Sequence, residues 1–134
     1  VEDSIANIAL QAQNARIHVK FRRNFSIDKF FEGALDNTNQ VLKAGLIKKE
    51  FYEEICRQLP IWYSFMNDRG VLKGDEMFHL IKGDTLRSVY RGANGEVLMD
   101  QIQVGQERRL AVLGSYLVKK SDFRKGLIES LFAY

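Results

Sequence analysis

The chain has 134 residues and a net charge of +3, from 20 Lys and Arg against 17 Asp and Glu. Apolar residues make up 46% of it, which excludes a disordered chain and predicts a single domain over residues 1–134 with a sizeable core. The basic residues form no continuous stripe, so we expect no nucleic-acid partner. The single cysteine, Cys56, excludes an intrachain disulfide and a cysteine-rich metal site.

The start of the chain bears on its location. No apolar run approaches the ~18 residues that a membrane-spanning helix needs, so we expect no transmembrane segment. The first residue is Val rather than Met. We therefore favour a periplasmic or organellar location, after removal of a leader, over a cytoplasmic one. The oligomeric state stays open.

The first expected elements are a short helix and a strand. The helix spans about Ile5–Gln13. The segment Arg16–Arg22 alternates apolar and polar residues, with Ile17, Val19 and Phe21 on one face. This period of two predicts a half-buried strand.

Two amphipathic helices follow. Ser26 has the side chain of a helix N-cap, and apolar residues recur after it at three- and four-residue steps as far as Gly45. A second apolar stripe begins near Lys48 and continues to Met66. Pro60 lies inside this stripe, so we expect a kink there or a break into two helices.

The second half of the chain predicts a three-stranded meander and two closing helices. The strands are expected at Glu76–Lys82, Thr85–Arg91 and Glu96–Gln103, joined by turns at Gly83-Asp84 and Asn94-Gly95. The helices are expected at about Gln106–Leu117 and Asp122–Phe132. Together these elements predict an α+β fold, an antiparallel sheet with helices layered on one face.

Four short segments match one known family in order. They are the strand Arg16–Phe21, the helix start Ser26-Ile27-Asp28-Lys29, the turn Gly74-Asp75, and Ala111-Val112-Leu113-Gly114-Ser115, which is close to an Ala-Val-Leu-Glu-Ser helix. In this arrangement nearly the whole chain resembles the chalcone isomerase-like proteins, whose fold is an open-faced sandwich. The resemblance also implies that the strands preceding Val1 in that family are missing here.

The resemblance implies a protein without the family's catalytic residues. The family's catalytic Tyr falls on Phe25 or Ser26, its Asn near Gly33, and its late hydroxyl near Met99, while its Arg and Thr belong to the missing strands. Only a Lys persists, as Lys20. Because stabilising an enolate or phenolate needs several aligned donors, we expect no catalytic residues and a non-catalytic role.

Some members of the family bind fatty acids, and this suggests a ligand. We expect a fatty acid or a similar small hydrophobic or amphipathic molecule between the helix that begins after Ser26 and the sheet. The expected ligand-binding residues are Lys20, Phe30, Phe31, Tyr52 and Trp62. Aromatic residues in helical stripes are, by default, part of an ordinary core, and this is the favoured alternative.

Three other functions stay open: an isomerase or intramolecular lyase acting on a phenolic substrate, haem binding, and a structural or protein-interaction role. His18 and His79 lie on separate expected strands, and three or four ligands are typical of a metal site, so we expect no metal. A haem requires one axial ligand, for which His79 is the candidate.

Overall fold

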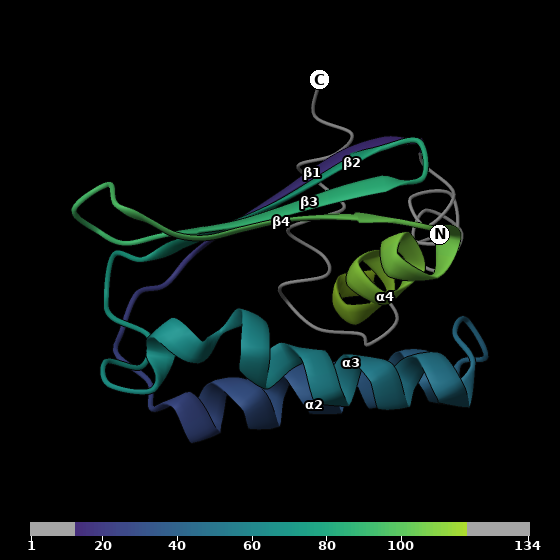
Figure 1. The fold of residues 1–134 in the computed structure, drawn as a ribbon, viewed down its shortest axis with the longest axis horizontal. Helices are drawn as coiled ribbons and strands as arrows, with labels where there is room; N and C mark the ends of the chain where they lie inside the picture. Colours follow the sequence, from purple (N-terminus) through teal and green to yellow (C-terminus); the bar gives the residue numbers. More distant parts are fainter. Residues whose placement is uncertain (1–12, 118–134) are drawn as a thin grey trace.

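The computed structural model describes residues 13–117 (Figure 1). Within them a four-stranded antiparallel sheet carries three α-helices on one face. This arrangement confirms the expected α+β class. The helix expected over Ile5–Gln13, apart from its last residue, and the helix expected over Asp122–Phe132 lie outside the described residues.

The strands follow one another across the sheet in chain order. They are β1 (Asn14–Lys20), β2 (Glu76–Lys82), β3 (Thr85–Arg91) and β4 (Val97–Val104). The three strands of the predicted meander are confirmed, and β1 pairs with β2 at the edge of the sheet. Gly83 and Gly95 adopt positive φ values of 62° and 89° in the two turns, a conformation that glycine tolerates without steric cost.

Helix α2 (Ile27–Lys43) begins and ends as its sequence predicts. The Ser26 hydroxyl accepts a hydrogen bond from the Lys29 amide at 3.2 Å, which satisfies one of the free N–H groups of the first turn. Asp28 lies in the first turn and Lys43 in the last. Both charges are therefore at the helix ends where the macrodipole favours them.

Helix α3 (Lys49–Trp62) runs through Pro60 and ends just beyond it. A short 3-10 helix, η1 (Ser64–Met66), then carries the chain toward β2. The expected break into two helices therefore occurs, but after the proline rather than at it. A proline in the last turn removes only one hydrogen bond and leaves little helix beyond it to disrupt.

Helix α4 (Gln106–Leu117) lies between the sheet and the other two helices (Figure 1). Its close approach to α2 depends on Gly114, because a Cβ atom at this position would lie 2.9 Å from Val41 Cγ2. The core fills the space between the sheet and the helices. Its most deeply buried side chains include Ile17, Val41, Met66, Val71, Tyr90 and Leu113.

Candidate functional site

A cavity of about 140 Å³ lies between the helical layer and the inner face of the sheet. From the sheet it is lined by Met77, His79, Leu86, Ser88, Met99 and Gln101, and from the helices by Phe30, Ala34, Leu59, Trp62, Val112 and Tyr116, among others. The strand residues come from alternate positions of β2, β3 and β4, which all face the helices. An engineered apolar cavity of about 150 Å³ is enough to hold benzene.

A row of polar side chains crosses the sheet side of this cavity. The strand register pairs His79 with Ser88 and Ser88 with Gln101. His79 Nδ1 and Ser88 Oγ are 2.8 Å apart, and both side chains are buried. Burial lowers the pKa of His79 to about 4, so the imidazole is neutral at pH 7. The row therefore offers neutral hydrogen-bonding groups in an otherwise largely apolar wall.

Arg108, in the first turn of α4, is the cation of the described cavity wall. Its guanidinium lies 4.7 Å from the Phe51 ring centroid and 5.2 Å from that of Trp62, and it donates to Gln58 Oε1. Burial lowers its pKa, but a guanidinium stays charged at pH 7. Its nearest described carboxylate, that of Glu54, is 3.7 Å away.

Most of the remaining hydroxyl groups that line the cavity already make hydrogen bonds within the protein. Thr38 Oγ1 donates to the Ala34 carbonyl at 2.8 Å, and Ser115 Oγ donates to the Ala111 carbonyl at 2.6 Å. Burial raises the pKa of Tyr116 to about 12, so its phenol is neutral. No carboxylate belongs to the lining residues described. The site thus combines apolar walls, neutral polar groups and one cation, which suits an apolar molecule with a polar or anionic end.

The structure brings together two of the five residues expected to bind a ligand. Phe30 and Trp62 both line the cavity. Phe31 packs near them, with its ring centroid 5.8 Å from that of Phe30, but is not part of the lining. Tyr52 packs against a core cluster of Val41, Ile47, Ile55 and Ala111 and is not part of the lining. Lys20 is exposed at the end of β1, at a position that faces away from the helices.

Sequence reasoning missed most of the polar lining. His79 was singled out only as a candidate haem ligand. Ser88 and Gln101 could have been found as well, because each is a polar residue at an inward position of a strand. Such a residue needs a partner when it is buried. No such signal marks Arg108. It comes only a few residues after the last strand, in a first helical turn made of polar residues, so its sequence neighbours do not distinguish it from an ordinary surface arginine. Its role depends on the packing of α4 against α3.

Neither a metal nor a haem is favoured by these residues. Among residues 13–117, no group of three His, Cys, Asp or Glu side chains could hold a metal ion. His79 does line the cavity, as a haem ligand would. However, a porphyrin is several times larger than the benzene-sized molecules that a cavity of about 140 Å³ accommodates. The described cavity therefore does not fit a haem.

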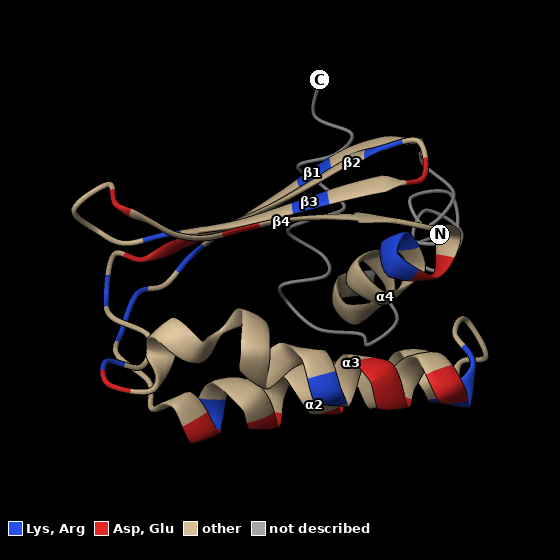
Figure 2. Ribbon diagram, in the orientation of Figure 1, with Lys and Arg blue, Asp and Glu red and all other residues tan. Residues whose placement is uncertain are grey.

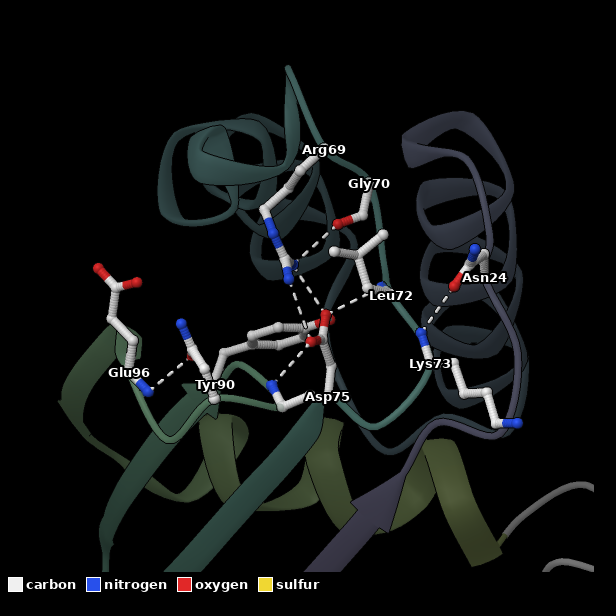
Figure 3. A network of polar contacts seen from close by, with 10 residues as sticks. Asn24, Arg69, Gly70, Leu72, Lys73, Asp75, Tyr90 and Glu96 are labelled. Atoms are coloured by element: carbon white, nitrogen blue, oxygen red, sulfur yellow. Dashed lines mark hydrogen bonds and ion pairs between the residues drawn. The ribbon is translucent and has the colours of Figure 1, made fainter.

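A second polar cluster lies at the far end of the sheet, around the fully buried Asp75 (Figure 3). Arg69 donates to both of its carboxylate oxygens at 2.7 and 3.1 Å, and Tyr90 Oη donates at 2.7 Å. The amides of Leu72 and Ala93 complete the set at 2.9 and 3.3 Å. Burial alone would raise the pKa of Asp75, but these donors outweigh it and lower the pKa. Because the acceptor sites of Asp75 are occupied, this cluster has a structural role: it connects the loops to the strands.

Comparisons with known proteins add no assignment. No model of a known protein family matches the chain, and no curated protein matches it closely enough to count as a relative. Within residues 13–117, no helix combines the length and the apolar character needed to cross a bilayer.

Proposed function

We propose that this chain is a non-catalytic binding module that takes up a small amphipathic molecule, such as a short fatty acid, in the cavity beneath the sheet. The observation that carries the proposal is the combination of an apolar cavity of about 140 Å³ with the desolvated guanidinium of Arg108 in its wall. The resemblance of the sequence to the chalcone isomerase-like family, some of whose members bind fatty acids, supports the same ligand class.

The proposed orientation places the carboxylate of the ligand at Arg108. A guanidinium carries five N–H donors, and the described contacts with Gln58 and Glu54 leave capacity for another anionic group. The tail would lie against Met77, Met99 and the helix side chains of the cavity. The polar row of His79, Ser88 and Gln101 would then orient any second polar group of the ligand.

The chemistry of the same wall supports a non-catalytic role. His79 has a pKa of about 4 and is therefore a weak base at pH 7. No described lining residue is a carboxylate that could act with it. The described lining suits binding and orientation of a ligand, and it includes no matched acid and base.

Calorimetric titration with butanoate, hexanoate and octanoate tests the proposal, with 1-octanol as the uncharged control. We expect octanoate to bind more tightly than 1-octanol. Arg108→Gln should weaken octanoate binding about tenfold, the loss of one charged hydrogen bond, and leave 1-octanol unchanged. Ala34→Leu should fill the cavity and weaken both ligands, whereas Ala44→Leu, at the exposed end of α2, should change neither.

Two results would count against the proposal. One is an absence of binding by every fatty acid together with repeated purification from cells without a bound small molecule, as judged by native mass spectrometry. The other is equal binding by wild type and Ala34→Leu, since the ligand would then lie elsewhere. Ring closure of a chalcone by the purified protein would favour the isomerase alternative instead.

A further inference from the structure

The outer face of the sheet carries an ordered arrangement of cations and exposed aliphatic side chains. All three described α-helices lie on the opposite face (Figure 1), so no described element covers this one. The strand register aligns Arg16 with Leu80, Leu80 with Arg87, and Arg87 with Ile102. Basic and aliphatic residues therefore alternate along one row that crosses all four strands.

The neighbouring row toward the β2–β3 turn continues the pattern. It pairs Lys82 with Thr85, and Thr85 with Val104. Ile102 is 65% exposed and Val104 is 70% exposed, while Leu80 is exposed to 36%. We call this set the basic–aliphatic patch; its members are Arg16, Leu80, Lys82, Arg87, Ile102 and Val104.

The patch keeps a net positive charge, although Asp100 neutralises one of its three cations, Arg87. Glu76 and Asp100 are the carboxylates that the four strands carry, and both lie outside the patch. Glu76 pairs with Arg91 and His18, and Asp100 pairs with Arg87. No ion pair with another described residue engages Arg16 or Lys82. Figure 2 shows the basic positions on β1, β2 and β3.

We propose that the basic–aliphatic patch docks onto the surface of an anionic membrane. Cations at the level of the headgroups are attracted by lipid phosphates, and aliphatic side chains between them can enter the boundary of the acyl chains. The sheet presents both kinds of side chain together, on a surface free of helices in the described structure. This contact is independent of the cavity and of any ligand in it.

Two other occupants fit the patch less well. A second copy across a two-fold axis would place the same cations opposite one another, because such an interface uses the same surface twice. Single-stranded nucleic acid needs an open aromatic face for base stacking. Phe78, the aromatic residue on the outer face of the four strands, is already stacked by His18 with a centroid distance of 4.4 Å and an interplanar angle of 5°.

Sedimentation with vesicles of phosphatidylcholine, with or without phosphatidylglycerol, tests the proposal. We expect binding only to the anionic vesicles, and weakening as salt is raised. The double variant Arg16→Glu/Lys82→Glu should lower the partition at least about 25-fold, since each cation near the surface contributes roughly a factor of five. The control Lys29→Glu/Arg57→Glu changes the net charge equally on exposed positions of α2 and α3 and should bind as wild type does.

The aliphatic part of the patch has its own test. Ile102→Ser/Val104→Ser leaves the charge unchanged and should weaken vesicle binding several-fold, because less apolar area enters the membrane. Several results would overturn the proposal: no binding to anionic vesicles, equal binding to neutral ones, or equal loss in the α2–α3 control. Retention by an anionic oligonucleotide in place of vesicles, or dimerisation that depends on the patch, would assign the surface to a different partner.

Discussion

Asp75→Asn is the substitution that tests most sharply how the sheet and its loops are joined. The wild-type carboxylate is 0% exposed and accepts from Arg69, Tyr90 and the amides of Leu72 and Ala93. An asparagine in the same place keeps one acceptor oxygen, but its NH₂ group faces donors. The substitution also leaves the Arg69 guanidinium without its ionic partner.

The expected loss follows from this geometry. Removing one partner of a buried ion pair costs about 3–5 kcal/mol. The Arg69 side chain is 24% exposed, so water compensates part of its lost interaction. We therefore expect the free energy of unfolding to fall by about 3 kcal/mol, the lower end of that range. For a domain of this size this corresponds to a decrease of roughly 10 °C in Tm.

Urea unfolding followed by circular dichroism at several pH values provides the assay. The pKa of Asp75 is lowered in the folded state, so its contribution is complete above the unfolded value of about 3.9 and is lost as the pH falls through the folded value. The gap between wild type and Asp75→Asn should thus be constant from pH 8 to pH 5 and narrow below about pH 4.

The control is Asp100→Asn, which breaks the exposed ion pair with Arg87 on the outer face. Exposed pairs contribute little to stability, so its unfolding midpoint should stay close to that of wild type. The reasoning is refuted if Asp75→Asn unfolds at the wild-type urea concentration, or if both asparagine variants lose the same stability.

Three further predictions concern the core and the helices. Burial lowers the pKa of His79 from 6.5 to about 4, so the free energy of unfolding should fall progressively as the pH is lowered from about 6.5 to 4. His79→Gln should remove this dependence, and a variant with an unchanged pH profile would contradict the explanation by burial. Gly114→Ala should lower the free energy of unfolding by about 1–2 kcal/mol in a urea titration, because the new Cβ would lie 2.9 Å from Val41 Cγ2 and overpacking outweighs the gain in helix propensity. A more stable variant would show that α4 can move away from α2 at no cost. Ser26→Ala should cost about 1 kcal/mol in the same titration through loss of the cap on α2, whereas Ser26→Asp should retain most of the stability.

The strands and turns were predictable because their signals are local. The turn signals at Gly83-Asp84 and Asn94-Gly95 located the strands of the meander, and both glycines adopt positive φ in the structure. The N-cap at Ser26 located the start of α2 in the same way. These features depend on neighbours within a few residues, so the sequence alone contains them.

The cavity was only partly predictable because it depends on how distant elements pack. The resemblance predicted that Phe30 and Trp62 bind a ligand, and both line the cavity. Lys20 was expected from the same resemblance. On β1, however, it alternates with the buried residues in the same way as Arg16 and His18, and so lies on the face that points away from the helices. Arg108 enters the site only because α4 places its first turn beside Trp62.

The methyl groups of the three methionines provide the most direct test of the proposed binding cavity. Met77 and Met99 line it, whereas Met66 is fully buried and is not part of the lining. In a titration of protein with ¹³C-labelled methionine methyl groups, octanoate should shift the signals of Met77 and Met99 and leave that of Met66 nearly unchanged. No change in the first two signals at saturating octanoate, or equal changes in all three, would contradict the account.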